Sequence, residues 1–173
     1  MSLPVALVGE PELASIVDAA WTCALGVDDL PRQGPPVTGA GEWLRAGVGI
    51  HGAWDGVVTL ECTRTAAVGA TSSMLALSPE AICDADVHDA LGELANVVGG
   101  GVKSLMPEHH RLTLPVVEPT TGVSTTSYDD LVARLDLTWR GEPVVVTVAR
   151  TSPPAGSEPG RPTARRTAGE PVS

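Results

Sequence analysis

A helical stretch in the middle of the chain, residues 84–106, constrains the fold more than any other part of the sequence. It reads DADVHDALGELANVVGGGVKSLM. Asp84 is expected to cap this helix at its start, and Pro107 is expected to end it. Apolar residues recur every three or four positions, which is the spacing of one buried face of an α-helix: Val87, Leu91, Leu94, Val98, Val102 and Leu105. The stretch therefore predicts a long helix that is buried along one side.

The other side of the predicted helix carries a polar stripe made of Asp89, Glu93, Asn96, Gly100 and Lys103. At 100° per residue, Glu93 and Asn96 project within about 60° of each other. A carboxylate that can bind a cation and an amide that can orient a water molecule would then share one face. Periodicity alone leaves a second interpretation open, in which both are solvated polar residues without a further role.

Three consecutive glycines, Gly99 to Gly101, interrupt the same helical pattern. Each glycine inside a helix costs about 1 kcal/mol relative to alanine, so three together need a physical reason. Two reasons stay open at this point: the helix backbone packs tightly against a neighbouring element, or a partner molecule docks there. The run lacks the Lys-Ser/Thr pair that follows the glycines of a phosphate-binding loop, so nucleotide binding is not expected.

The rest of the chain predicts two further helices, several strands and a tail. Pro115 cannot donate a hydrogen bond to a sheet, so it must lie at an edge, a bulge or a strand end. Residues 1–150 are expected to form one domain, and residues 151–173 a disordered tail rich in Pro, Ser and Arg. The predicted helices cover 11–26 and 65–77, and the predicted strands cover 46–52, 57–62, 111–117, 131–139 and 143–149, with a loop over 28–41 and a weak extended segment over 120–127.

Composition excludes several classes of protein. The formal net charge of -10 argues against nucleic acid or an anionic membrane as a partner. The chain has no apolar run of about 18 residues and no secretory leader pattern, so a cytoplasmic location is expected.

Cys23, Cys62 and Cys83 are odd in number and lack CxxC spacing, so they are predicted to be reduced and buried. His109 and His110 are adjacent and therefore seldom point the same way, so no metal site is predicted.

Taken together, the polar stripe and the residues after it resemble the signature of the CheC, CheX and FliY chemotaxis phosphatases. The segment GELAN, residues 92–96, is most similar to the CheX branch, and only one such motif is present. The order of the flanking hairpins and helices is also similar over about residues 10–150. The residues that carry the resemblance are Asp89, Glu93, Asn96, Gly100, Leu114 and Pro115.

The resemblance implies a two-layer α/β fold in which helices pack on one face of a mostly antiparallel sheet. It implies a homodimer joined through sheet edges, and it implies hydrolysis of the aspartyl phosphate on a CheY-like response regulator. An acyl phosphate is already activated, so catalysis needs mainly placement and charge compensation. Asn96 would orient the attacking water, and Glu93 would engage the regulator's active-site lysine.

The same comparison implies that no cofactor or metal ligand belongs to this chain, because the regulator would supply Mg²⁺. Two other functions stay open, since a fold does not guarantee an activity. The chain would then bind a receiver domain without catalysis, or it would serve only for dimerisation. Four further residues are expected to contact the partner: Asp89, Gly100, Lys103 and Pro115.

Overall fold

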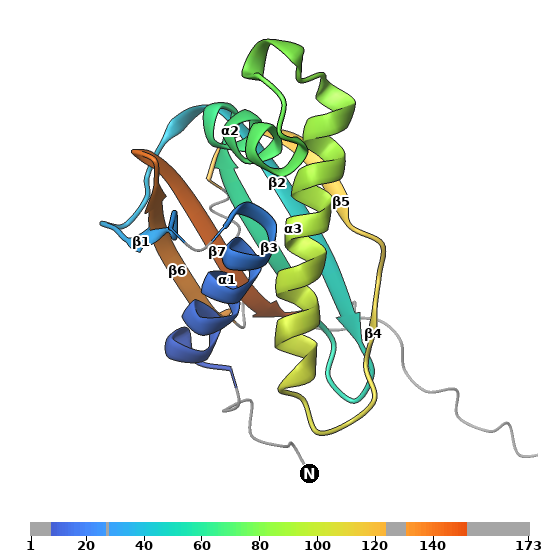
Figure 1. Ribbon diagram of the computed structural model, residues 1–173. Helices are drawn as coiled ribbons and strands as arrows, with labels where there is room; N and C mark the ends of the chain where they lie inside the picture. The colour runs from blue at the N-terminus through green and yellow to red at the C-terminus, as the bar shows by residue number, and fades with distance from the viewer. Residues whose placement is uncertain (1–7, 27, 124–130, 152–173) are drawn as a thin grey trace, which may run out of the picture.

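The structure is a computed structural model that describes residues 8–26, 28–123 and 131–151. In these residues, three α-helices lie on one face of a seven-stranded antiparallel sheet (Figure 1). The strand order is β1 (Arg32–Gln33), β6 (Leu131–Trp139), β7 (Glu142–Arg150), β3 (Gly56–Thr63), β2 (Ala40–His51) and β4 (Arg111–Leu112), and β5 (Val116–Gly122) also pairs with β2. This arrangement confirms the predicted two-layer fold. None of the described helices combines the length and the hydropathy that a membrane span needs.

The helices and strands agree closely with the prediction in most places. The helices are α1 Glu10–Leu25, α2 Arg64–Leu75 and α3 Asp84–Ser104, with a short 3-10 turn at Pro79–Ala81. The strands are β1 Arg32–Gln33, β2 Ala40–His51, β3 Gly56–Thr63, β4 Arg111–Leu112, β5 Val116–Gly122, β6 Leu131–Trp139 and β7 Glu142–Arg150.

Two expectations about strands were wrong. The predicted loop over 28–41 contains β1 and the start of β2, because β2 continues past the glycine-rich residues to pair with β5. Gly41 accommodates a register shift in that pairing with a φ of 137°. The predicted strand 111–117 is divided into β4 and β5, and Pro115 lies just before β5 begins. Residues 124–127 of the weak extended segment and residues 152–173 of the predicted tail lie outside the described residues.

The start of α3 also differs from the prediction. Cys83, and not Asp84, is the N-cap residue, and its backbone N–H donates a hydrogen bond to Asp86 Oδ2 at 2.9 Å. Asp84 is the first helical residue, and its carboxylate pairs with Arg64. Cys83 is therefore exposed, as is Cys23, so the prediction of three buried thiols holds for Cys62 alone.

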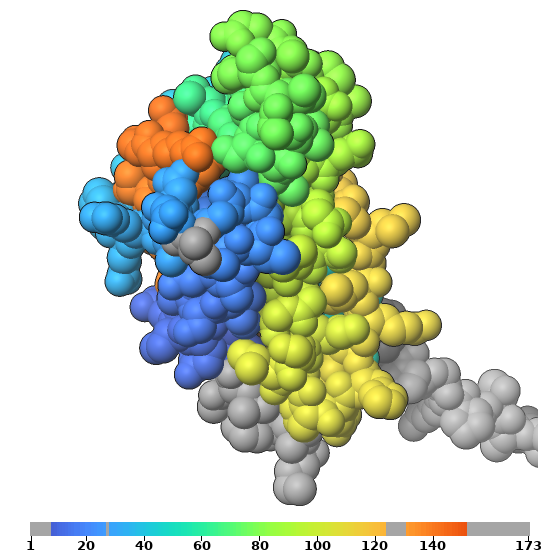
Figure 2. Space-filling model, viewed as in Figure 1, coloured from blue at the N-terminus to red at the C-terminus, as the bar shows by residue number. Residues whose placement is uncertain are grey.

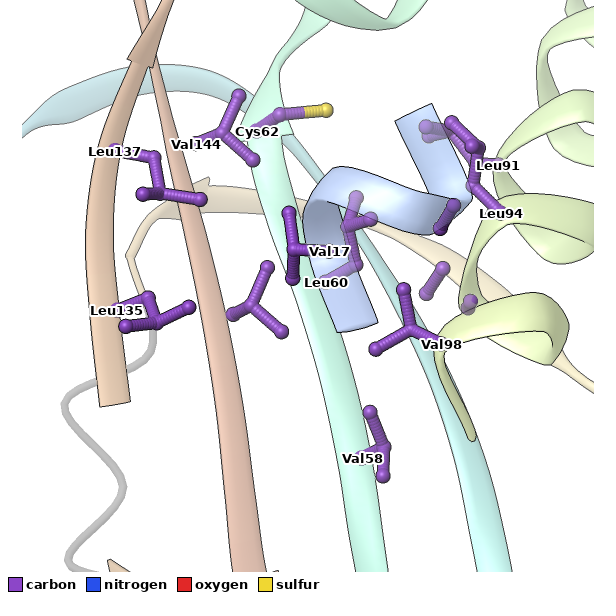
Figure 3. Packing of buried hydrophobic residues seen from close by; sticks show 14 of the residues in the cluster. Val17, Val58, Leu60, Cys62, Leu91, Leu94, Val98, Leu135, Leu137 and Val144 are labelled. Carbon is purple, nitrogen blue, oxygen red and sulfur yellow. The ribbon is translucent and has the colours of Figure 1, made fainter. Parts of the chain in front are cut away.

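The hydrophobic core lies between the sheet and the three helices, as Figure 3 shows. Five of the six apolar residues predicted on α3 are buried, and Leu105 is 37% exposed because it lies just beyond the end of the helix. Each buried Val or Leu contributes about 1.5–3 kcal/mol relative to an exposed one. This stripe fixes the rotation of α3 and so keeps its polar stripe outward. Figure 3 labels Val17, Val58, Leu60, Cys62, Leu91, Leu94, Val98, Leu135, Leu137 and Val144.

Candidate functional site

The outer face of α3 carries the predicted acid and amide. Glu93 is exposed and Asn96 is half-buried, and they lie one helical turn apart. Within the described residues, neither side chain takes part in a hydrogen bond or an ion pair. Figure 2 shows α3, drawn in green to yellow-green, as part of the molecular surface. Both functional groups are therefore accessible to a second molecule.

The three consecutive glycines of α3 serve different purposes. A Cβ atom added to Gly99 would lie 3.3 Å from Val48 Cγ1 of β2. A Cβ atom added to Gly101 would lie 2.5 Å from Ile16 Cγ2 of α1, which is too close for real atoms. A Cβ atom added to Gly100 would meet nothing within 4 Å. Tight packing therefore explains Gly99 and Gly101, but it does not explain Gly100.

A fourth glycine, Gly92, brings Pro115 against α3. A Cβ atom on Gly92 would lie 3.3 Å from Pro115 Cγ, so the proline ring packs on the helix backbone. Gly92 and Asn96 are four residues apart and so lie on the same side of the helix. The predicted residue Pro115 therefore borders the stripe on the side of Asn96. Sequence reasoning gave Gly92 no role, because nothing in a single sequence indicates a contact between residues 92 and 115.

The polar stripe carries two carboxylates, Asp89 and Glu93, and one ammonium group, Lys103. Asp89 is exposed and Lys103 is half-buried, and in the described part of the chain neither forms an ion pair. In the first turn of α3, the hydrogen bond from Arg64 holds the pKa of Asp84 below its ordinary value. Hydrogen bonds from Cys83 likewise lower the pKa of Asp86. The face thus presents its carboxylates in the first half of α3 and one ammonium group near its end.

No group of three or more His, Cys, Asp or Glu side chains in the described ranges is arranged to hold a metal ion. His110 is buried, and both of its ring nitrogens have protein partners. Nδ1 lies 2.8 Å from the carbonyl oxygen of Glu108, and the backbone N–H of Trp54 donates to Nε2 at 3.1 Å. His109 is exposed beside it, so the two histidines do not converge.

Chemically, the arrangement suits action on another molecule. The carboxylate of Glu93 can bind a cation, and the amide of Asn96 can both donate a hydrogen bond to a water molecule and accept one from it. An amide is not a base at neutral pH, so Asn96 can orient a water molecule but cannot take a proton from it. The pair lies on the surface of a helix, where it can enter a cleft of a partner.

Comparisons with solved structures identify related folds at low sequence identity. The chemotaxis protein CheX from Vibrio vulnificus is 20% identical, with a TM-score of 0.67, covering 86% of this chain and 99% of that chain. CheX in a CheX-CheY-BeF3-Mg²⁺ complex from Borrelia burgdorferi is 14% identical, with a TM-score of 0.61, covering 80% and 95%. FliY from Thermotoga maritima is 16% identical, with a TM-score of 0.54, covering 87% and 92%. At such identities the comparisons establish the fold.

A sequence comparison with curated proteins found no match. A comparison with family profiles found the family described as chemotaxis phosphatase CheX, which matches residues 45–132. The matched region is just over half of the chain, and it contains the polar stripe of α3, Gly92 and Pro115. This protein belongs to the CheX family of chemotaxis phosphatases.

Proposed function

We propose that this chain hydrolyses the aspartyl phosphate of a phosphorylated CheY-like response regulator in the cytoplasm. The observation that carries the proposal is the exposed position of Glu93 beside Asn96 on α3, without partners among the described residues. The relative from Borrelia burgdorferi, which was solved in complex with CheY, BeF3 and Mg²⁺, supports a regulator of this class as the partner.

In the proposed mechanism, Asn96 enters the active-site cleft of the regulator and orients a water molecule for in-line attack on phosphorus. Glu93 engages the regulator's lysine, whose compact positive charge suits a carboxylate. The regulator supplies Mg²⁺, and this chain contributes no metal ligand. Placement of the water and compensation of charge are the main requirements, because the acyl phosphate is already activated.

The four other residues of the site would shape the contact with the regulator. Gly100 would let the regulator approach the helix backbone, since no side chain covers that position. Asp89 and Lys103 would pair with charged groups of the partner on either side of the catalytic pair. Pro115 would border the partner on the side of Asn96.

The test is the rate at which a phosphorylated CheY-like regulator loses its phosphate, with wild type or Asn96→Ala added. Loss of a preorganised positioning group costs about 10²-fold or more in rate, so Asn96→Ala should lose at least that much. Gln33→Ala is the matched control, because it removes an exposed amide on β1, at the opposite edge of the sheet. Full activity in Asn96→Ala would refute the mechanism. A wild-type protein that binds the phosphorylated regulator without shortening its lifetime would instead be a binding module.

A further inference from the structure

Leu114 is the most exposed large hydrophobic residue in the described part of the chain, at 87%. We infer that Leu114 is the apolar anchor through which this protein binds the receiver domain of its regulator. This inference rests on the proposed function, because it concerns the same partner and the same face. It adds a requirement on that partner, which is an apolar pocket beside the cleft that holds the aspartyl phosphate.

The backbone on both sides of Leu114 is held in place. Before it, the Thr113 N–H donates to the Gly49 carbonyl oxygen at 2.9 Å, and the Gly49 N–H donates to Thr113 Oγ1 at 2.9 Å. After it, Pro115 has a fixed φ and packs on Gly92 of α3. The backbone that carries Leu114 is therefore preorganised, so little backbone freedom is lost when a partner binds there.

The direction of Leu114 follows from its two neighbours. The side chain of Thr113 lies over Gly49, on the face of the sheet without helices, because Val48 and Ile50 on either side of Gly49 face the core. Pro115 lies on the opposite face, against α3. The chain thus crosses the edge of the sheet between these residues, and Leu114 projects outward from that edge.

Leu114 also lies close to the catalytic pair. Its Cα is about 3.8 Å from that of Pro115, Pro115 contacts Gly92, and the Cβ positions of Gly92 and Asn96 are about 5–6 Å apart. The Cα of Leu114 is therefore within about 15 Å of the Cβ of Asn96. A standard protein interface of about 800 Å² per partner has a radius of about 16 Å. In Figure 2 the yellow segment after α3 forms one continuous surface with the helix. A receiver domain centred on Asn96 would therefore cover Leu114.

No residue described in α3 is a large exposed hydrophobic residue, and its exposed stripe is made of polar side chains and glycine. Apolar area that a partner removes from water at this face must therefore come from a neighbouring segment. Val116, which is 64% exposed, is next to Val117, which packs against the core, so Val116 points to the face without helices. Leu131 is in β6, separated from β2 by β7 and β3. Leu105, which is 37% exposed, lies beyond the end of α3, and Leu114 is the exposed apolar side chain that borders the stripe on the side of Asn96.

The test measures the dissociation constant of a CheY-like receiver domain loaded with beryllofluoride and Mg²⁺, a probe that binds without being hydrolysed. Leu114→Ser should raise that constant at least 10-fold, and it should raise KM for dephosphorylation while kcat is unchanged. Leu131→Ser, the same substitution at a Leu that is 49% exposed, should leave the dissociation constant and KM within about two-fold of wild type. Thr113→Val keeps Leu114 but removes the bond from Gly49, so it should weaken binding to a smaller extent.

The outcomes separate this inference from the proposed function. If Leu114→Ser binds the loaded domain as tightly as wild type, the anchor is refuted even where dephosphorylation is observed. If wild type binds through Leu114 but releases no phosphate, the anchor stands and the phosphatase proposal fails. A variant that changes the sedimentation of the free protein instead of its affinity for the receiver domain would assign Leu114 to contact with a second copy, and it would overturn the inference. If wild type binds no CheY-like receiver domain, both proposals are overturned.

Discussion

Replacing Gly100 by alanine should stabilise this protein and impair its activity at the same time. Gly100 lies inside α3, and a Cβ atom there would meet nothing within 4 Å. The substitution therefore costs no packing, and it gains the helix preference of alanine over glycine, which is about 0.5–1 kcal/mol. In a domain of this size, the midpoint of thermal unfolding should rise by about 1–4 °C.

Gly101→Ala is the matched control, because it gains the same helix preference at the next residue. Its Cβ atom would lie 2.5 Å from Cγ2 of Ile16, a β-branched residue of α1 that cannot easily move aside. Overpacking of this kind costs about 1–3 kcal/mol. The difference in free energy of unfolding between the two variants should therefore be about 1–3 kcal/mol in favour of Gly100→Ala.

Although Gly100→Ala should be more stable than wild type, it should be less active. If a regulator approaches the helix closely at this position, an added methyl group displaces it from Asn96, and a displacement of about 1 Å can cost 10²-fold in rate. Chemical denaturation measures the free energy of unfolding, and phosphate release from the regulator measures the rate. A variant that is stabilised but fully active would show that Gly100 has no part in docking. A variant that is destabilised would show that the space around Gly100 is not open.

Three other results are expected. Burial raises the pKa of the Cys62 thiol from 9.0 to about 12, so at pH 8 an alkylating reagent should modify only the other two cysteines until the protein unfolds. Because the unfolded thiol ionises first, the free energy of unfolding should fall as the pH rises from about 9 to 12, and labelling of all three native thiols would contradict this prediction. Arg140→Ala removes a partly exposed ion pair with Asp29 at 2.5 Å and a cation–π contact at 4.4 Å from the Trp139 ring centroid. The free energy of unfolding measured with denaturant should fall by about 1 kcal/mol, and no change would mean that solvent screens both contacts. The chain is predicted to dimerise through a sheet edge, so sedimentation should give twice the 17.7 kDa mass, and a monomer would refute it.

The sequence was most informative where one face of an element is buried. The period of the apolar residues on α3 predicted both its buried and its exposed side, because a helix packed on a sheet has only one rotation that buries them. The start of β2 at Ala40 was not predictable in the same way. Its hydrogen bonds go to β5, and the pairing of Ala40 with Gly122 depends on chain topology and not on the local glycine-rich sequence.

In the candidate site, too, features set by local periodicity were predictable and features set by contacts between distant segments were not. The shared face of Glu93 and Asn96 follows from helix periodicity and needs no other part of the chain. The position of Pro115 beside Asn96 depends on contact with Gly92, which joins α3 to a segment more than 20 residues later. Its prediction as a partner-binding residue came from the resemblance to a family, and the geometry that explains it is visible only in the fold.

The distribution of glycines on α3 connects the packing of the fold with the exposure of the site. Gly92 lets Pro115 approach the helix, Gly99 lets it lie close to the sheet, and Gly101 lets it lie close to α1. The contacts of Gly92 and Gly99 come from the side of the sheet and that of Gly101 comes from α1, so together they hold α3 in one rotation. Gly100 lies between two of these positions in the sequence, yet it faces open space on the side of Asn96. A helix whose neighbours approach this closely cannot rotate to bury its polar stripe, so the packing that stabilises the domain also keeps the acid and the amide exposed for a partner.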